Sequence, residues 1–354
     1  MLRVIFFPQW LDNPYQNLLA EHLEKLGVQL DNSSYSSTTL LLNSLARSKP
    51  DVLHLHALHP FFLSSSKTKS AIKLGVSLGQ LVTLRLLGIK IVWTAHNLKN
   101  HENKYPTLDR IFTTLVVRLA HGIIAHGETA KQEVIKAFSL REIDKIFVIP
   151  HGNYFTYYEN NLSRIEARKA LNIPDTSLVL LFLGLIRPYK GVLEMIDAFR
   201  QLHQDGVQLV IAGKLADKEL AELINQKVKD CSAIKFIPGF VADEQIQVYM
   251  NACDAVVLPY RDILTSGSII LAMSFSRACI APRKGCIGDV LDDSGAFLYD
   301  PDMEKGLLQA MNHAIQHRTD LLQMGERNRQ LAEQWGWNRV AEMTLHVYQQ
   351  CFNS

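Results

Sequence analysis

The stretch "SLVLLFLGLIRPYKG", residues 177–191, indicates the fold class of this chain. It opens with a continuous apolar run, as do strands that are buried on both faces of a parallel sheet. The run ends at Gly184, and Arg187 and Lys190 follow before the helical pattern of residues 191–206. Open α/β sheets bind their ligands at the carboxyl ends of such strands. Two cations three residues apart, flanked by glycines, therefore predict a site for two adjacent phosphates.

Strand-like runs alternate with helical patterns through both halves of the chain, which predicts an α/β fold with parallel sheets covered on both faces. We expect two Rossmann-like domains, residues 1–155 and 156–334. The polar segment 158–177 is interpreted as a linker that contains a short helix. The strand-like runs are residues 2–7, 50–57, 88–96, 122–127, 145–152, 177–184, 207–213, 234–240, 255–260, 279–282 and 295–300.

The amino-acid composition argues against several classes of protein. The 354 residues are 47% hydrophobic and 20% charged, which is typical of globular domains. A formal net charge of only +2 argues against a dedicated nucleic-acid binder. The five cysteines lack CxxC spacing, so we expect a reduced, cytoplasmic protein without a disulfide framework or zinc site. The N-terminus lacks signal-peptide features, and no apolar run approaches the roughly 20 residues of a spanning helix.

Three further strand ends in the second half carry side chains suited to a nucleotide. Gly213 and Lys214 form a small-then-cationic end, and Phe240 with Val241 is placed to cover a flat base. Residues 265–268 begin a helix, where hydroxyls and N–H groups either hold a phosphate or merely cap the helix. With Gly184, Arg187 and Lys190, these ends predict a nucleoside-diphosphate site. Its further members are Gly213, Lys214, Phe240, Val241, Thr265, Ser266, Gly267 and Ser268.

These motifs resemble those of GT-B glycosyltransferases, most of all the large family 4 (group 1). "FLGLIRPYKG" is similar to the family's donor-diphosphate motif, "VIPHG" to the end of its first domain, and "FIPGFVADEQIQVYMNACDAVVLPY" to its nucleotide-binding stretch. "DDSGAFLYDPDM" and "TAHN" (94–97) also resemble family segments, the latter an acceptor-side histidine motif. "WGWNRVAEMTLHVYQ" looks like the helix that returns to the first domain, so residues from about 335 to 354 are expected there.

The resemblance implies two facing Rossmann-like domains and a hexosyltransferase-type enzyme, retaining or inverting. Such an enzyme moves a sugar from a nucleotide sugar to a glycan or lipid-linked acceptor, as in polysaccharide biosynthesis. The nucleotide sugar is a co-substrate, with a UDP-sugar as the first choice and a GDP-sugar as the second, and no further cofactor is expected. An epimerase of the same architecture and a non-catalytic nucleotide-binding protein stay open as alternatives.

The chain departs from the family pattern at one place. Many members carry two glutamates eight positions apart, where this chain has Leu264 and Ala272. Arg261, with Asp262, is then a candidate for the contacts with ribose or sugar that the glutamates make. Asp292 and Asp293 are adjacent rather than spaced as in a metal-binding DxD motif. We therefore expect a metal-independent enzyme in which Arg187 and Lys190 stabilise the leaving diphosphate.

The first half supplies the candidates for acceptor chemistry. His96 follows the strand-like run 88–96, at the carboxyl end where the site is expected. If transfer is inverting, His96 or Glu102 is the general base; if it is retaining, His96 contacts the donor sugar. Asn13, Tyr15 and Asn97 are expected on the acceptor side. The histidines of "HLHALH" (54–59) are not expected to converge on a metal, and His54 is interpreted as a core residue.

The segment between Asp51 and Glu102 contains no acidic residue but six lysines and arginines. Leucine and valine alternate with these charges, as in basic amphipathic helices that lie on anionic membranes. The same pattern suits a core helix whose outer face is basic. Peripheral association with the inner face of a membrane is thus one of two interpretations.

Overall fold

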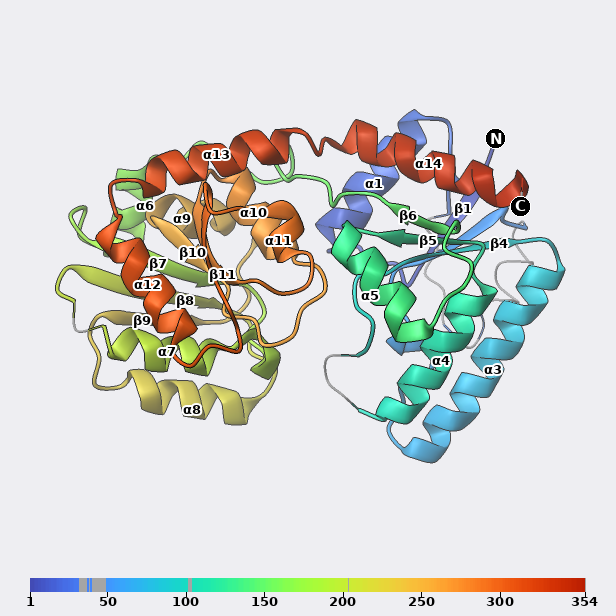
Figure 1. Cartoon of the computed structure of the whole chain (residues 1–354), viewed down its shortest axis with the longest axis horizontal. Helices are drawn as coiled ribbons and strands as arrows, with labels where there is room; N and C mark the ends of the chain where they lie inside the picture. The colour runs from blue at the N-terminus through green and yellow to red at the C-terminus, as the bar shows by residue number, and fades with distance from the viewer. Residues whose placement is uncertain (32–36, 38, 40–48, 101–103, 203, 354) are drawn as a thin grey trace. The chain divides into compact units, whose positions relative to one another are not determined.

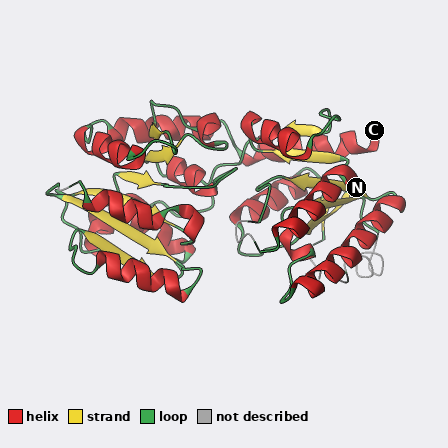
Figure 2. Ribbon diagram, turned by 60° about the horizontal axis from the view of Figure 1, so that its bottom comes forward, coloured by secondary structure: helices red, strands yellow, loops and turns green. Residues whose placement is uncertain are grey.

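The structure is a computed structural model that describes residues 1–31, 37, 39, 49–100, 104–202 and 204–353. Its internal contacts divide the chain into two compact units (Figure 1). Unit 1 comprises Met1–Gly152 and Trp335–Ser354, and unit 2 comprises Asn153–Gln334. The sequence placed this boundary at residue 155. Each unit is a parallel sheet flanked by helices, so the predicted fold of two Rossmann-like domains is confirmed (Figure 2).

Unit 1 is built on a six-stranded parallel sheet of order β2-β1-β3-β4-β5-β6. Its strands coincide with the predicted runs, except for the two-residue β2, which was not predicted. The strands are β1 (Arg3–Phe7), β2 (Gln29–Leu30), β3 (Val52–Leu55), β4 (Lys90–Thr94), β5 (Gly122–Ala125) and β6 (Ile146–Val148). The helices are α1 (Pro14–Lys25), η1 (His59–Phe61), α3 (Lys67–Leu86), α4 (Pro106–Leu119), α5 (Glu128–Phe138) and α14 (Trp337–Asn353).

Helix α14 belongs to unit 1 because one of its faces is apolar along its whole length. Its buried residues recur at intervals of three and four, from Trp337 through Val340 and Tyr348 to Cys351, which is the spacing of one helical face. The helix packs against α1, β4 and β5. A Cβ at Gly122 would lie 2.9 Å from a Val347 methyl carbon, so this glycine allows the close approach of α14.

Unit 2 is built on a second parallel sheet of order β12-β11-β10-β7-β8-β9. The segment interpreted as a linker contributes α6, which packs against α9 as part of this unit. The strands are β7 (Leu178–Leu183), β8 (Val207–Gly213), β9 (Ile234–Pro238), β10 (Ala255–Val257), β11 (Ala278–Pro282) and β12 (Ala296–Tyr299). The helices are α6 (Arg164–Ala170), η2 (Pro188–Lys190), α7 (Val192–Arg200), α8 (Lys218–Val228), α9 (Asp243–Ala252), α10 (Gly267–Ser274), α11 (Ile287–Val290), α12 (Gly306–Gln316) and α13 (Leu321–Glu333).

The strand order of unit 2 places the predicted phosphate-binding ends side by side. From β7 the chain proceeds outward through β8 and β9, and then returns to the other side of β7 as β10. This reversal makes the β7–β10 neighbourhood a topological switch point, where open α/β sheets bind ligands. The four strand ends singled out in the sequence therefore follow four adjacent strands, in the order β10, β7, β8, β9.

Candidate functional site in unit 2 and a histidine cluster in unit 1

Three adjacent strands of unit 2 each end in a glycine with positive φ. The values are +135° at Gly184 after β7, +148° at Gly213 at the end of β8, and +139° at Gly239 after β9. Side chains disfavour this conformation, and a Cβ at Gly213 would overlap the carbonyl oxygen of Gly184. The amide of Gly239 donates to the Gly213 carbonyl at 3.0 Å. The result is a row of bare backbone along the carboxyl edge of the sheet, which a ligand can approach closely.

The loops after β7 and β8 are held together beyond the sheet. The amide of Ile186 donates to the Lys214 carbonyl at 2.8 Å, and the amide of Ala216 donates back to the Ile186 carbonyl at 3.0 Å. This extra bridge fixes the backbone on which Arg187 and Lys214 stand. Arg187 is half-buried and Lys214 is exposed. Arg187 and Lys214, two of the predicted phosphate ligands, therefore stand in or next to hydrogen-bonded backbone.

Lys190, in η2, brings its ammonium to the same place. A Cβ at Gly184 would lie 3.7 Å from Nζ of Lys190 and 3.8 Å from Oγ of Ser268, at the start of α10. The ammonium also lies 5.5 Å from the centroid of the buried Tyr260 ring, a cation–π contact. A cation from η2 and a hydroxyl from α10 therefore flank the end of β7.

Lys190 is a half-buried cation whose charge is not balanced by an ion pair among the described residues of unit 2. Burial lowers the pKa of its ammonium; Tyr189 opposes this, and the neighbouring Arg187 cation adds to it. The ion pairs of the described part of unit 2 join other arginines and lysines to aspartate or glutamate. A phosphate at the end of β7 would supply the missing negative charge.

The start of α10 is a capped helix terminus. Oγ of Ser266 accepts the amide of Ile269 at 3.4 Å, so the interpretation as a helix cap holds for this residue. Ser266 also donates to the Tyr260 hydroxyl at 3.3 Å. Leu264 and Ala272, which replace the family glutamates, are both buried. Thr265, Gly267 and Ser268 are half-buried beside the cap, where a phosphate interpretation remains a prediction.

The remaining predicted donor residues lie at the rim of this edge. Phe240 follows Gly239 with 76% of its surface exposed, and Val241 beside it is half-buried. Arg261 forms an ion pair with Glu194 of α7, and its amide donates to the Tyr189 carbonyl at 2.8 Å. Through this ion pair the Glu194 carboxylate lies at the rim, in a region where both family glutamates are missing.

In unit 1, the strand order gathers four histidines around one tyrosine. The rings of His56, His96, His126 and His151 have centroids 4.9–5.9 Å from that of Tyr15. Each follows a different strand, namely β3, β4, β5 or β6, at its carboxyl end. We call these four residues, His54 and Tyr15 the histidine cluster. The sequence signal for it was a histidine after each of four successive strands, but only His96 was selected from it.

The interior of the histidine cluster is only partly hydrogen-bonded. His54 pairs at 2.7 Å with both the Tyr348 hydroxyl and Oγ1 of Thr94, which agrees with its interpretation as a core residue. Nδ1 of His126 pairs with the Ile149 carbonyl at 2.9 Å. Both ring nitrogens of His56 and Nε2 of His126 are buried and find no partner among the residues that the structure describes. Such orphaned polar atoms are uncommon in folded proteins.

Burial keeps these imidazoles neutral. It is the largest cause in each case, and lowers the pKa of His54 and of His151 to about 3 and that of His126 to about 4. The pKa values of His56 and His96 are also well below the usual range, with neighbouring imidazoles adding to burial. At neutral pH the imidazoles are therefore uncharged, and each keeps one ring nitrogen that can accept a hydrogen bond.

His96 is the half-buried member of the histidine cluster, whereas the other histidines and Tyr15 are buried. Asn97, which follows it, is exposed. Asn13 caps α1, because its side-chain oxygen accepts the amides of Tyr15 and Gln16 at 3.0 and 3.3 Å. Glu102 lies outside the described residues. Of the predicted acceptor-side residues, Asn97 is thus exposed, His96 and Asn13 are half-buried, and Tyr15 is buried with its ring centroid 5.0 Å from that of His96.

Neither a metal site nor a membrane-spanning helix is found among the described residues. Within the described ranges, no set of three or more His, Cys, Asp or Glu side chains is arranged to hold a metal ion. Asp292 accepts the amide of Ser294 at 2.9 Å, and Asp293 pairs with Arg283 at 2.6 Å. None of the helices described there combines the length and apolarity required to cross a bilayer.

Comparison with known proteins identifies relatives of both units. A family model described as glycosyl transferases group 1 matches residues 177–317, and one described as glycosyltransferase family 4 matches residues 25–152. The GDP-mannose:glycolipid 4-beta-D-mannosyltransferase of Xanthomonas campestris pv. campestris is 28% identical over 267 residues, which are 75% of this chain and 71% of that protein.

Solved structures share the fold over the full length. Sucrose-phosphate synthase from Thermosynechococcus elongatus superimposes with a TM-score of 0.79 at 16% identity, covering 100% of both chains. Anabaena HepE, in a complex with UDP and glucose, gives 0.76 at 17% identity and covers 99% of this chain and 100% of its own. The TM-scores establish a common fold, and at identities of 16–17% the ligands have to be argued from this chain.

Proposed function

This chain belongs to the group 1 glycosyltransferases of family 4, and from that membership we propose that it moves a sugar from a nucleoside-diphosphate sugar, held by unit 2, to a lipid-linked or glycan acceptor. The observation that carries the donor assignment is Lys190, a half-buried cation beside the bare backbone of Gly184. Arg187, Ser268 and the start of α10 complete an anion-binding edge.

The same residues account for departure of the leaving group. When the glycosidic bond breaks, negative charge grows on the diphosphate, and preorganised cations and helix N–H groups stabilise it. We propose that Lys190 and Arg187 supply that charge without a metal ion. Transfer that continues at full rate in a chelator would support this assignment, and strict dependence on a divalent cation would contradict it.

We propose that His96 acts on the acceptor side. Its imidazole is neutral at pH 7 and is the accessible member of the histidine cluster, so it can accept the proton of an acceptor hydroxyl in an inverting transfer. In a retaining transfer it contacts the donor sugar instead. The Xanthomonas relative is named for GDP-mannose and a glycolipid acceptor. GDP-mannose and UDP-sugars are therefore the donors to test first, with lipid-linked acceptors at a membrane surface.

Replacing the Lys190 ammonium is expected to abolish most diphosphate binding. In Lys190→Met the dissociation constant for the matching nucleoside diphosphate rises about 10- to 100-fold, because a charge-assisted contact contributes about 1.5–3 kcal/mol. Stability without ligand is retained, since burial already disfavours the charged amine. The measurement is a thermal-shift titration with UDP, GDP, ADP and dTDP, in which a ligand at about 100 times its dissociation constant adds about 2.7 kcal/mol.

Lys169→Met is the matched control, because Lys169 is exposed on α6 and away from the sheet edge. It is expected to bind as the parent protein does. Equal diphosphate affinity in parent and Lys190→Met would remove the donor site from this edge. If none of the four diphosphates raised the melting temperature of the parent protein, the proposed donor binding would be contradicted.

His96→Gln is expected to separate chemistry from donor binding. The turnover number falls by about 10²-fold or more, because a positioned acid–base group contributes that much. The diphosphate-dependent thermal shift is unchanged, since that site is in unit 2. His346→Gln, at an exposed position of α14, is the control. A parent-like turnover in His96→Gln would exclude this imidazole from the reaction, and the anomer formed, read by NMR, decides between the two roles.

A further inference from the structure

Helix α3 buries Leu81 and Leu84 together with three polar side chains. Its buried face contains Ser70, Ser77 and Gln80, each of which is hydrogen-bonded. Oγ of Ser77 donates to the Phe61 carbonyl at 2.7 Å, Oγ of Ser70 accepts the Ser64 amide at 3.0 Å, and Gln80 donates to the Ser37 carbonyl at 3.0 Å. Two buried leucines and three hydrogen-bonded polar side chains therefore anchor this helix to unit 1, and its other face is exposed to solvent.

The solvent face of α3 carries an apolar stripe. Ile72, Val76 and Leu86 are 64%, 47% and 82% exposed. With Gly79 and Thr83 they form a stripe with alternating steps of four and three residues, which is one continuous helical face. Oγ1 of Thr83 donates to the Gly79 carbonyl at 2.8 Å, so its hydroxyl hydrogen is satisfied within the helix. A stripe of this kind is expected to be covered by an apolar surface.

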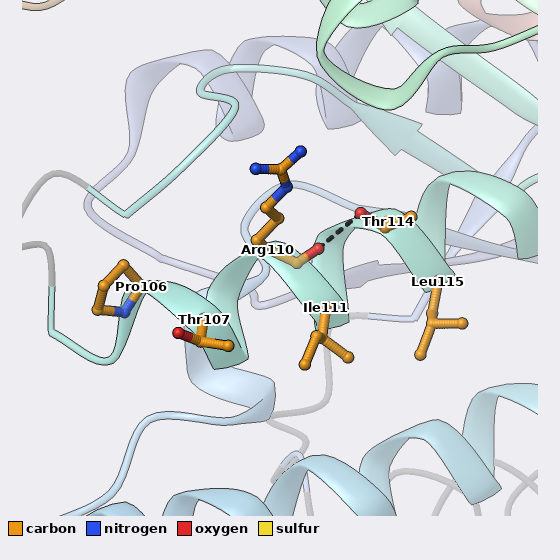
Figure 3. Close-up of a pocket in the computed structure, with 6 residues that line it drawn as sticks. All are labelled: Pro106, Thr107, Arg110, Ile111, Thr114 and Leu115. Atoms are coloured by element: carbon orange, nitrogen blue, oxygen red, sulfur yellow. Dashed lines mark hydrogen bonds between the residues drawn. The ribbon is translucent and has the colours of Figure 1, made fainter.

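The apolar surface continues onto α4, which packs against α3. A hollow of about 600 Å³ lies along α4 and is lined by Pro106, Thr107, Arg110, Ile111, Thr114 and Leu115. Figure 3 shows Ile111 and Leu115 extending from one side of α4 and Arg110 from another. The Thr114 hydroxyl donates to the Arg110 carbonyl at 2.7 Å. The stripe on α3 and this hollow together are called the α3–α4 face.

The α3–α4 face is cationic at its border. Residues 52–127 contain nine lysines and arginines and two acids, a net charge of +7 in a chain whose total is +2, so the remainder carries −5. One of the two acids, Asp109, is buried, and its Oδ2 accepts the Asn100 amide at 2.6 Å. Lys67, Lys69 and Arg85 on α3 and Arg110 and Arg118 on α4 are all exposed.

We propose that the α3–α4 face docks the protein onto a bilayer that contains anionic phospholipids. Apolar side chains flanked by lysine and arginine are the composition of helices that lie in the membrane interface, where the apolar part enters the acyl boundary and the cations meet the headgroups. A second copy of the chain is a poor partner. A symmetric dimer brings the same face of each subunit together, which would oppose like charges here.

The proposal rests on the proposed function for its purpose, because an enzyme with a lipid-linked acceptor must reach the membrane. Its test is independent of sugar transfer. The full chain is floated with vesicles of phosphatidylcholine alone and with about one-third phosphatidylglycerol, first at low salt and then at about 1 M, where the Debye length is about 3 Å. We expect flotation that requires phosphatidylglycerol and weakens at high salt.

Two sets of substitutions on α3 test the cationic border and the apolar stripe separately. Lys67→Gln with Lys69→Gln is expected to weaken vesicle binding about 25-fold, about fivefold for each cation lost. Ile72→Ser, Val76→Ser and Leu86→Ser together are expected to weaken it at least about tenfold, because three apolar side chains no longer enter the interface. The matched controls in unit 2 are Leu223→Ser with Leu322→Ser, and Lys218→Gln with Lys229→Gln, all at exposed positions. Both controls are expected to float like the parent.

Several results would overturn the proposal: no flotation of the parent, equal flotation without phosphatidylglycerol, or parent-like flotation of both α3 variants. A parent dimer in sedimentation velocity that the serine triple variant dissociates would instead assign the face to a second copy. Diphosphate binding is measured on the same preparations. Loss of vesicle binding with the thermal shift intact therefore counts against the docking face alone, and the reverse counts against the donor site alone.

Discussion

Acidification from about pH 7.5 to about pH 5 is expected to remove at least about 6 kcal/mol from the free energy of unfolding of unit 1. The source is the histidine cluster, in which burial lowers the pKa of His54 and His151 to about 3 and that of His126 to about 4. Each of these three contributes about 2 kcal/mol of the loss, at 1.36 kcal/mol per pH unit below the usual histidine pKa of about 6.5. Such a loss is comparable to the whole stability of many domains.

The sign follows from which state binds protons. In the folded protein the imidazoles stay neutral until the pH approaches their lowered pKa values. In the unfolded chain they take up protons at about pH 6.5. Between about pH 6.5 and the folded values, the unfolded state therefore binds more protons, and stability falls as the pH falls. Above about pH 6.5 this contribution is fully present and constant.

Tryptophan fluorescence measures this transition in unit 1 alone. All four tryptophans of the chain, Trp10, Trp93, Trp335 and Trp337, lie in that unit. Urea titrations at a series of pH values should give midpoints that are constant above about pH 7 and decline steeply below about pH 6. A flat profile between about pH 7.5 and about pH 5 would mean that the cluster is hydrated rather than buried.

His56→Leu is the variant that tests the origin of this effect. Both ring nitrogens of His56 lack partners among the described residues, so an apolar side chain of similar size removes buried polar atoms and a site of protonation together. The variant is expected to keep its stability at neutral pH and to show a shallower loss in acid. His346→Leu is the control, because solvent reaches that imidazole in the folded chain as well. Equal acid slopes in His56→Leu and the parent would exclude His56 as a source.

The donor edge was predictable from the sequence because the residues that form each strand end are close together in the sequence. A parallel strand that ends in a glycine and a cation delivers both to one edge of the sheet, whatever the distant residues are. Gly184 and Lys190 are six residues apart, and Gly213 with Lys214 repeats the pattern on the neighbouring strand. The strand order needed for their adjacency is that of an ordinary doubly wound sheet.

The histidine cluster was not predictable in the same way, because each histidine is isolated in the sequence. Their contact depends on β3, β4, β5 and β6 being neighbours and on Tyr15 arriving from α1. The solvent face of α3 was ambiguous for a related reason. Both faces of this helix carry apolar residues: Leu81 and Leu84 are buried beside Ser77, whose hydroxyl donates to the Phe61 carbonyl, whereas Ile72 is exposed.

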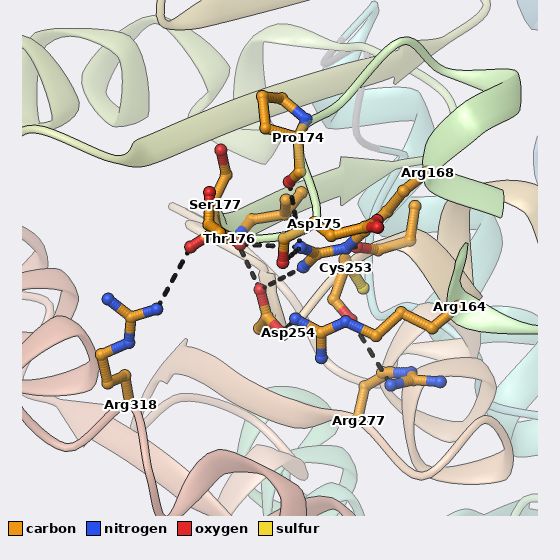
Figure 4. Close-up of polar contacts among 12 residues, drawn as sticks. Arg164, Arg168, Pro174, Asp175, Thr176, Ser177, Cys253, Asp254, Arg277 and Arg318 are labelled. Carbon is orange, nitrogen blue, oxygen red and sulfur yellow. Dashed lines mark hydrogen bonds and ion pairs between the residues drawn. The ribbon is translucent and has the colours of Figure 1, made fainter. Parts of the chain in front are cut away.

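Arg168 was overlooked because it lies in a segment that is polar enough to be interpreted as a linker. It is fully buried, and its guanidinium donates to carbonyls of residues 174, 175, 177 and 252 and to Asp254 (Figure 4). The same carboxylate accepts the Val179 amide at 2.7 Å, at the start of β7. One arginine of α6 thus ties together the segments that lead into β7 and β10, the two strands on either side of the switch point.

Arg168→Met is expected to lower the free energy of unfolding of unit 2 by about 3–5 kcal/mol. Removing one member of a buried ion pair leaves the Asp254 carboxylate short of a partner, and here it also leaves several carbonyls unsatisfied. Arg164 provides a matched control, since it pairs with the other oxygen of Asp254 at 2.7 Å but is half exposed. Arg164→Met should cost no more than about 1 kcal/mol, as is usual for surface pairs.

Urea denaturation followed by far-UV circular dichroism measures both variants, with tryptophan fluorescence as the internal control for unit 1. We expect Arg168→Met to shift the transition seen by circular dichroism while the fluorescence midpoint is unchanged. Similar small losses in the two variants would show that Arg168 contributes as an ordinary surface pair. A large loss in both variants would show that pairing of the Asp254 carboxylate, rather than the carbonyl contacts of Arg168, supplies the stability. The expected difference follows from the guanidinium of Arg168, which satisfies four carbonyls that no other described side chain reaches.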